Sequence, residues 1–232
     1  MTPLIMPDTP SGIAKVRFEI ERVDFAAPEA SGRVGGVQAG WPLWMATYDI
    51  DRSDPESGDL WTAFFDRLRG RQRLFLAGDP TRNFPKSRPS GFAGMLRAGG
   101  GAFDGSATSW SQTFDADNNA KFLCLGLPTG MTLSPRDLIG FKWDAVGSPA
   151  GTYNRRAMTR VVEVKNSDGG GGLNVMVEPP IDTSVVPAGA IAHFDNPRCL
   201  MRIIPEKSNL GPIGAGGAIG GGNIVAVQDL RV

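Results

Sequence analysis

Several residue types that would support common functions are scarce in this sequence of 232 residues. Two cysteines are too few for a disulfide-rich scaffold, and with a single histidine they do not supply a structural zinc site. No apolar run reaches the roughly 18 residues that predict a transmembrane helix. The first residues also lack the basic and apolar regions of a secretory signal. We therefore expect a soluble protein that is not exported by the usual route and has no metal site.

The sequence holds no arrangement typical of an active site. His193 is followed by Asp195, but a catalytic triad also needs a nucleophile on a sharp turn, and no Gly-x-Ser-x-Gly segment is present. Cys124 and Cys199 lie in apolar segments, where cysteine behaves as a small buried side chain. The segment Gly214-Ala-Gly216 begins like a dinucleotide-binding motif, but position 219 is not glycine. We therefore expect no enzyme, with no catalytic or cofactor-binding residues and no cofactor.

Pairs of acidic residues two positions apart are the remaining candidates for chemistry. Asp115 with Asp117, and Asp49 with Asp51, could hold a cation or act in glycoside hydrolysis. Such pairs are common on solvated loops, and we favour that interpretation.

The charged residues balance in number but not in position. Lys plus Arg and Asp plus Glu both number 24, so the basic excess of a dedicated nucleic-acid-binding protein is missing. Residues 1–60 carry 5 basic and 10 acidic side chains, a net charge of −5. Residues 61–100 carry 8 basic and 2 acidic side chains, a net charge of +6. This division suits a chain that joins head to tail with its own copies, although two separately solvated faces explain it equally well.

Period-two alternation predicts a protein made mainly of strands. Val16, Phe18 and Ile20 alternate with charged residues, and the apolar phase then shifts at Val23, which indicates a bulge or bend. Residues 43–48 alternate in the same way. Further strand-length apolar runs lie at 74–77, 122–125, 138–143, 158–164, 173–178, 191–194, 200–204 and 224–227. Short strands separated by Gly- and Pro-rich turns, without alternating helices, predict a sandwich or a barrel.

One amphipathic helix is predicted over about residues 57–69. Its apolar residues recur with helical spacing and form one stripe, at Leu60, Trp61, Phe64, Phe65 and Leu68. Acidic residues gather near its start and arginines near its end, as the helix dipole favours. Gly70 is placed to terminate the helix. The aromatic stripe requires a sheet to pack on.

The strand pattern divides the chain into two units. Segment 91–111 is rich in Gly and Ser and poor in strand signal, so it reads as a crossing. The strand at 199–204 can return to the first unit. We therefore expect residues 1–95 with 196–232 to form a β-sandwich domain that contains the helix. Residues 112–195 then form an inserted β-barrel-like domain.

The C-terminal region is predicted to be an arm. Residues 211–222 are a low-complexity glycine segment, typical of a flexible or extended linker. The apolar residues 224–227 that follow would suit strand addition to a neighbouring molecule. A frayed terminus is an equal alternative.

Two neighbouring motifs resemble a known family. The strand Gly40-Trp-Pro-Leu-Trp-Met-Ala-Thr-Tyr48 is followed by the helix and then by Leu68-Arg-Gly-Arg-Gln-Arg-Leu-Phe-Leu-Ala-Gly-Asp-Pro-Thr-Arg82. This order is similar to the distal tail protein family of long-tailed (siphovirus-type) bacteriophages and prophages, although Ala77 stands where that family often has leucine. Later pieces that resemble the family lie at 137–140, 177–180 and 187–190. The resemblance covers about residues 14–204, and the glycine-rich end has no counterpart in it.

The resemblance implies a structural protein of the virion. Distal tail proteins form a homohexameric ring at the distal end of the tail, between the major tail tube protein and the tail tip or baseplate hub protein. Their ring-forming domain is a tail-tube-like β-sandwich with one packed helix, and a second β-barrel commonly faces outward. Genomic DNA passes through the lumen, no membrane is bound, and assembly takes place in the host cytoplasm.

A ring of this kind needs complementary surfaces on successive subunits. We expect Arg71 and Arg73, on one face of the strand after the helix, to meet acidic residues of the next subunit. The acidic candidates are Asp49, Asp51 and Asp54. Pairing of the arginines within the chain is an equal alternative. The loop that starts at Arg82 is a candidate for a contact between rings.

Two other functions remain open. A carbohydrate- or host-receptor-binding β-sandwich of the tail tip would use exposed tryptophans to stack on sugar rings, and Trp110 and Trp143 are its candidates. A tail-associated hydrolase would need a carboxylate pair in a cleft, for which only the acidic loops are available.

Overall fold

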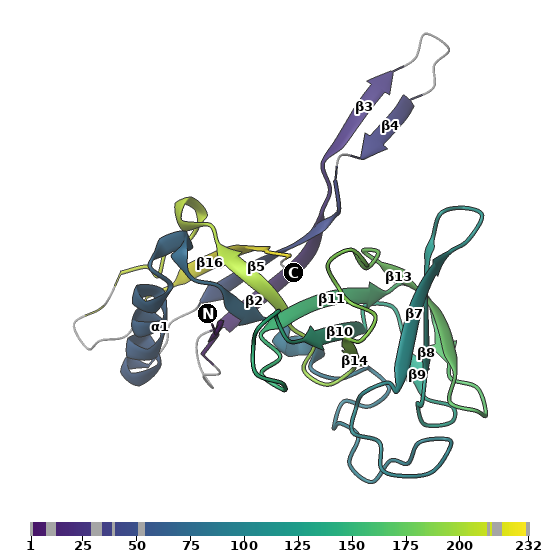
Figure 1. Cartoon of the computed structure of the whole chain (residues 1–232). Coiled ribbons are helices and arrows are strands. Elements are labelled where there is room, and N and C mark those ends of the chain that lie inside the picture. The colour runs from purple at the N-terminus through teal and green to yellow at the C-terminus, as the bar shows by residue number, and fades with distance from the viewer. Residues whose placement is uncertain are drawn as a thin grey trace.

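The computed structural model describes residues 2–7, 13–28, 34–38, 40–50, 54–212, 214 and 220–230. Within these residues the chain is mainly β with one α-helix, which confirms the predicted fold class (Figure 1). Most strands belong to two six-stranded sheets, and a hairpin projects from the body between them.

The first sheet combines strands from both ends of the chain. Its order is β1-β6-β15-β16-β5-β2, and neighbouring strands are antiparallel except for β1 and β6. The strands are β1 (Leu4–Ile5), β6 (Phe75–Ala77), β15 (Cys199–Ile203), β16 (Gly222–Gln228), β5 (Leu43–Ile50) and β2 (Ile13–Glu21). The sheet is therefore complete only after the last strand of the chain has been added.

Alternation along β5 decides which face of this sheet is buried. Trp44, Ala46, Tyr48 and Ile50 are buried, whereas the residues between them are half-buried or exposed. Successive side chains of a strand point to opposite faces, so this pattern defines one apolar face. The predicted period-two signal over 43–48 is confirmed.

Helix α1 (Pro55–Leu68) contributes to the same apolar cluster through Trp61, Phe64 and Leu68. The rings of Phe64 and Phe75 meet edge to face with centroids 5.4 Å apart. The helix and the sheet thereby share one core, as the aromatic stripe predicts.

The ends of α1 follow from its capping residues. Asp54 accepts a hydrogen bond from the Ser57 amide, and Pro55 occupies the first turn, so the helix starts two residues before the predicted position. At the other end Arg69 has a left-handed conformation, with φ 50°, and Gly70 follows with φ 61°. Arg69, one residue before the predicted Gly70, is the first to leave the helix. A 3₁₀ turn, η1 (Gly70–Gln72), comes next.

The second sheet closes on itself. Its strand order is β14-β10-β11-β13-β8-β7. The strands are β14 (Ile191–His193), β10 (Leu138–Trp143), β11 (Arg155–Val161), β13 (Leu173–Glu178), β8 (Ala120–Leu125) and β7 (Ser109–Phe114). The Ala107 amide donates to the Ala192 carbonyl, and the Phe194 amide donates to Gly105, so the segment before β7 pairs with β14. We call this closed unit the barrel. A two-stranded ladder, β9 (Thr132–Leu133) with β12 (Lys165–Asn166), lies beside it.

The barrel has its own aromatic core. Phe122, Phe141 and Phe194 are buried, and the half-buried Trp110 packs on the first two. Trp110 belongs to β7, which extends three residues beyond the segment 91–111 that the sequence predicts to be a strand-poor crossing.

The two sheets are joined at β5 and β11. The Trp44 indole Nε1–H donates a hydrogen bond of 2.7 Å to the Met158 carbonyl. Leu138 and Met158 are part of the apolar cluster of the first sheet. The chain crosses between the sheets twice, after β6 through the 3₁₀ turn η2 (Pro80–Arg82) and again between β14 and β15.

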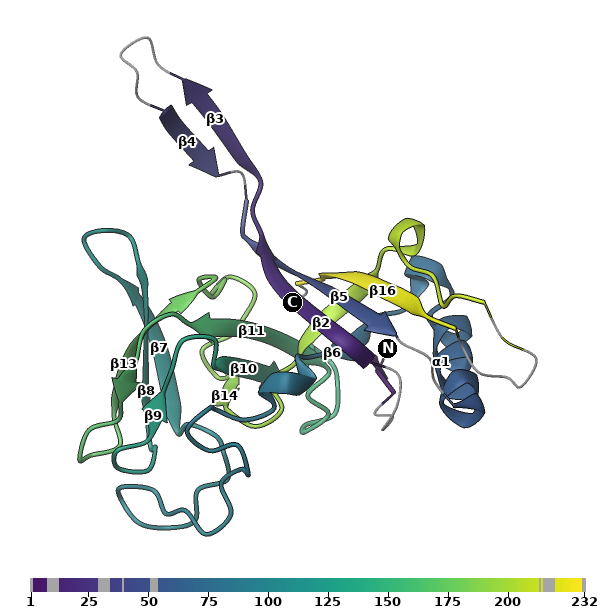
Figure 2. The same cartoon turned by 180° about the vertical axis from the view of Figure 1, so that it is seen from behind.

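A hairpin stands out from the body. Strands β3 (Asp24–Pro28) and β4 (Val34–Gln38) pair with each other in a separate two-stranded ladder (Figures 1 and 2). The phase shift predicted at Val23 marks the place where β2 ends and this hairpin begins. The register irregularity of β2 itself lies elsewhere, between Ile13 and Lys15.

The prediction for the C-terminal arm is wrong for its apolar end. The residues 224–227 lie in β16, which pairs with both β15 and β5 inside the chain's own first sheet. Ile224 and Ala226 are fully buried there. Because these side chains are buried within the chain, they do not form the exposed apolar strand that strand addition to a neighbour would need. Before β16 comes the 3₁₀ turn η3 (Pro205–Lys207). Half of the glycine segment (213 and 215–219) lies outside the described residues.

Candidate functional site

The arginines predicted to form an interface do not lie on a strand. Arg71 is in η1, and the next strand begins only at Phe75. The sequence misplaces them because Gly70 allows a tight turn before the strand. The Arg71 guanidinium pairs with the Glu206 carboxylate at 2.6 Å, and its carbonyl accepts a hydrogen bond from Arg202. Pairing within the chain is thus realised for Arg71, while Arg73 is half-buried.

The acidic partners predicted for these arginines have separate roles. Asp49 is exposed on β5, where it lies opposite Lys15 and Asn223 in the register. Asp54 caps α1 through the amide and hydroxyl of Ser57. Asp51 lies outside the described residues. A contact of these acids with a second subunit stays a prediction.

The loop that begins at Arg82 is fixed to the barrel by a buried carboxylate. Asp137 accepts hydrogen bonds from the amides of Lys86 and Ser134, both at 2.8 Å. Burial raises the pKa of Asp137, while these two bonds and the charge of Arg82 act in the opposite direction. The Arg82 Nε atom is itself buried without a partner in the part of the chain that the structure describes. The loop is therefore held in place within the subunit, and its contact between rings stays a prediction.

His193 packs against glycine. The imidazole is buried, and its Nδ1 lies 2.8 Å from the Asp195 carbonyl oxygen and 3.2 Å from the Asp195 carboxylate. The Nε2 atom has no hydrogen-bond partner among the described residues. It faces Gly140, where an added Cβ would lie only 2.5 Å from Nε2. The position leaves no room for a substrate at this atom, so the geometry favours a packing role.

The acidic pair at the β7–β8 turn organises that turn. Asp115 accepts hydrogen bonds from the amides of Asp117 and Asn119. The Asn119 amide bond is the largest of the influences that lower the pKa of Asp115. In the residues that the structure covers, no cluster of three or more His, Cys, Asp or Glu side chains could hold a metal ion.

The two tryptophans proposed for sugar stacking are packed. Trp143 is buried, and Trp110 is half-buried with its indole N–H donating to the Ala190 carbonyl at 2.7 Å. The Trp110 ring lies 4.8 Å from that of Phe141. The burial of Trp143 and the partial burial of Trp110 do not favour the exposed rings that carbohydrate stacking requires.

Both thiols are expected to be inert in the folded protein. Burial raises the pKa of Cys124 to about 12 and raises the pKa of Cys199 further still. Because the thiolate is the nucleophile, alkylation by iodoacetamide at pH 7.5 should be negligible over an hour without denaturant and complete for both residues in 6 M guanidinium chloride. Mass spectrometry measures the alkylated fraction. Rapid labelling of either cysteine in the folded state would contradict the enclosed positions.

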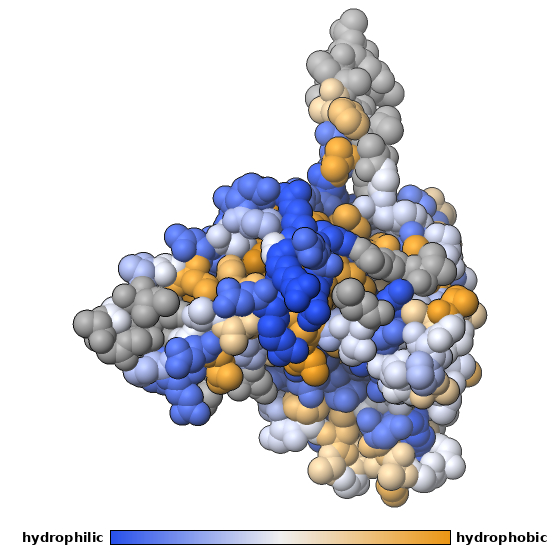
Figure 3. Space-filling model, turned by 60° about the vertical axis from the view of Figure 1, so that its left-hand side comes forward, coloured by the Kyte–Doolittle hydropathy of each residue, from blue (hydrophilic) through white to orange (hydrophobic). Residues whose placement is uncertain are grey.

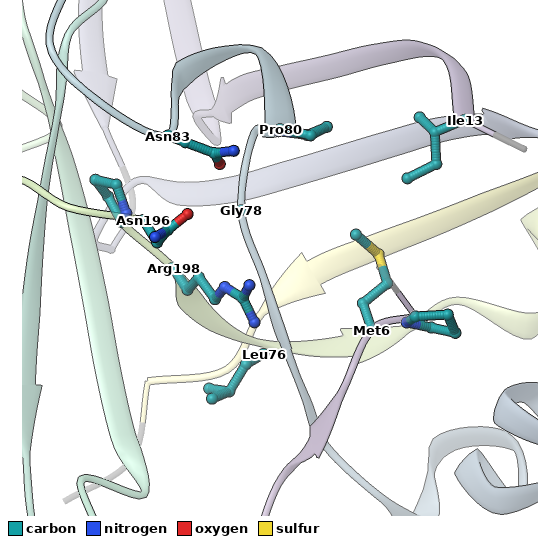
Figure 4. Close-up of a pocket in the computed structure, with 10 residues that line it drawn as sticks. Met6, Ile13, Leu76, Gly78, Pro80, Asn83, Asn196 and Arg198 are labelled. Atoms are coloured by element: carbon teal, nitrogen blue, oxygen red, sulfur yellow. The ribbon is translucent and has the colours of Figure 1, made fainter. Parts of the chain in front are cut away.

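A small cavity lies where the chain crosses between the sheets. Its volume is about 200 Å³, and Figure 4 shows Met6, Leu76, Asn83, Asn196 and Arg198 around the strand that passes through Gly78. The Asn196 amide donates to the Asn83 carbonyl at 2.7 Å, which links the two crossings. No periodic pattern in the sequence indicates this cavity, because its residues come from the N-terminal segment, from β6 and from both crossings.

A wider groove follows the edge strand β2. Its volume is about 640 Å³, and it lies between β2 and the barrel. Val16, Phe18 and Ile20 form its apolar wall. Its charged lining consists of Arg17, Glu19, Arg22, Arg136, Arg160 and Glu178. Sequence reasoning missed this group because it gathers residues from four separate segments.

The hairpin carries exposed apolar side chains where it leaves the body. Phe25 is 63% exposed and Val23 is 56% exposed. Figure 3 shows apolar residues at the base of this projection, beside hydrophilic residues of the body. Large apolar side chains that stand in solvent on a projecting element are typical of a contact surface.

Comparison of the sequence with models of known families gives no match, and comparison with curated proteins gives none either. Within the described ranges, no helix is both long and apolar enough to cross a membrane.

Proposed function

We propose that the chain is a structural subunit of a bacteriophage tail that assembles into a ring joining the tail tube to the tip hub. The observation that carries this proposal is the projecting hairpin with its exposed Phe25 and Val23. The mainly β fold with one helix agrees with the fold that the family resemblance implies. The expected ring is a homohexamer through which DNA passes.

The hairpin supports assembly for a physical reason. Its two strands pair only with each other in the part of the chain that the structure describes. An isolated two-stranded hairpin is marginally stable in water and gains stability when its apolar side chains are covered. Burying a phenylalanine and a valine contributes about 1.5–3 kcal/mol each. A neighbouring subunit would provide that cover.

Light scattering after size exclusion, with negative-stain images of the peak, tests the proposed function. A ring of six subunits has a mass near six times 24.7 kDa. We expect ring-shaped particles of that mass, with the ring fraction rising with protein concentration. A monomer that persists up to millimolar concentration would contradict the proposal.

Removing the apolar surface of the hairpin should weaken the ring. The double variant Val23→Ser/Phe25→Ser is expected to raise the concentration at half-assembly at least tenfold, because it removes apolar area that a neighbour would bury. Sedimentation velocity measures this shift. Val146→Ser is the matched control, because Val146 is 93% exposed in a barrel loop. Unchanged assembly of the hairpin variant would exclude the hairpin from the contact.

A further inference from the structure

Arg160 is a half-buried cation without a salt bridge to a carboxylate among the described residues. Its guanidinium lies over the ring of Trp44, 5.3 Å from the centroid, and Nη1 is 3.5 Å from the Phe18 carbonyl. Burial, and after it the charge of Arg136, lowers the pKa of Arg160. Arginine still keeps its charge at neutral pH. Because a desolvated charge is costly when unpaired, an anion in this groove would be stabilised.

The two carboxylates nearest to Arg160 are already engaged. Glu178 lies beside Arg160 in the β11–β13 ladder and pairs with Arg22 at 2.5 Å. Glu19 pairs with Arg17 at 2.7 Å. Each of these pairs is neutral in sum, so the groove lining keeps two positive charges in excess, although Glu19 and Glu178 also act on Arg160 through their charge.

Arg136 lines the groove together with Arg160. It is exposed on the turn before β10 and has φ 75°, with its amide donating to the Val161 carbonyl. This backbone bond holds the turn at the groove, so the guanidinium is presented next to Arg160. The groove therefore carries two positive charges in excess over an apolar wall. Two carboxylates spaced by a few ångströms would complement it.

The chain carries such a pair at the start of α1. Glu56 and Asp59 are exposed and have no ion pair in the described part of the chain. Residues three positions apart lie on the same face of a helix, so both carboxylates can reach one surface. Figures 1 and 2 show α1 at one end of the first sheet and the barrel at the other. The helix of one chain does not line the groove of that same chain.

We propose that the groove along β2 receives the acidic start of α1 from a second copy of the chain, with Arg136 and Arg160 pairing with Glu56 and Asp59. This inference rests on the proposed ring and names the two surfaces that meet in it. The contact joins two different surfaces, so it propagates head to tail, as ring closure requires. In this proposed interface the positive charges come from Arg136 and Arg160, whereas the sequence analysis assigned that role to Arg71.

A charge swap tests the pairing. Arg136→Glu should raise the concentration at half-assembly at least tenfold, because it sets like charges against each other. Glu56→Arg should do the same. The double variant Arg136→Glu/Glu56→Arg should recover most of the loss, since every contact then pairs opposite charges again. Lys165→Glu, at an exposed lysine of β12, makes the same charge change away from the groove and should leave assembly unchanged.

The outcomes separate this inference from the proposed function. If the unmodified chain forms rings and Arg136→Glu forms them equally well, the groove is not the contact while the ring proposal stands. Failure of the double variant to recover assembly would likewise overturn the pairing with α1. A monomeric unmodified chain would overturn the ring itself. Melting temperatures equal to that of the unmodified chain establish that the variants are folded.

Discussion

Replacing Trp44 with alanine is expected to lower the free energy of unfolding by about 3–5 kcal/mol. Trp44 is fully buried in the first sheet, with its ring 5.6 Å from that of Phe18. Its indole N–H reaches across to the Met158 carbonyl in the barrel. The substitution therefore leaves a cavity in one core and removes a hydrogen bond between the two units.

Guanidinium chloride unfolding followed by circular dichroism measures this effect. Trp44→Phe is the informative companion, because it keeps an aromatic ring at the site while it removes the N–H donor and part of the ring volume. We expect a loss of about 1–3 kcal/mol for this variant, from the lost hydrogen bond and incomplete filling of the site. If the free energy of unfolding of Trp44→Ala were within about 1 kcal/mol of that of the unmodified chain, the junction between the sheets would not depend on this side chain.

Gly140→Ala is expected to destabilise the barrel. The new Cβ would lie 2.5 Å from the His193 Nε2 atom and 2.7 Å from its Cε1, where both paired residues are buried. We expect the free energy of unfolding to fall by about 1–3 kcal/mol, because overpacking forces side chains or backbone to shift. Gly169→Ala is the matched control, since its Cβ meets no atom within 4 Å.

A double-mutant cycle shows whether His193 is the cause. His193→Ala removes the clashing ring, so Gly140→Ala should cost much less in that background than in the unmodified chain. Strictly additive effects of the two changes would contradict this packing. The cycle also bears on His193 as a catalytic candidate, because a ring that fills space above a glycine needs no substrate to explain it.

The sequence predicts elements well where one strand or helix has a clear apolar face. The runs at 138–143 and 173–178 coincide with β10 and β13. Helix α1 is found because five large apolar residues form one stripe, and its ends shift by only one or two residues through local capping. These signals are local, so no knowledge of the rest of the chain is needed to detect them.

The same local patterns misplace elements whose partner is distant. The pattern at residues 224–227 predicts an exposed apolar strand. Nothing nearby in the sequence indicates that β5, more than 170 positions away, pairs with them. The pattern places Arg71 on a strand, because the alternation of apolar and polar residues does not detect the turn at Gly70. A distant strand partner decided the first case and a local turn decided the second, and apolar alternation detects neither of them.

Local apolar periodicity by itself determined that this chain is mainly β with one amphipathic helix, because side-chain alternation depends only on neighbouring residues. Tertiary structure alone decided that both chain ends share the first sheet and that a hairpin stands clear of it. It also decided that Arg136 and Arg160 meet β2 in one groove. Such contacts join residues more than 100 positions apart, and their free energy depends on burial and charge neighbours that arise only when the chain is packed.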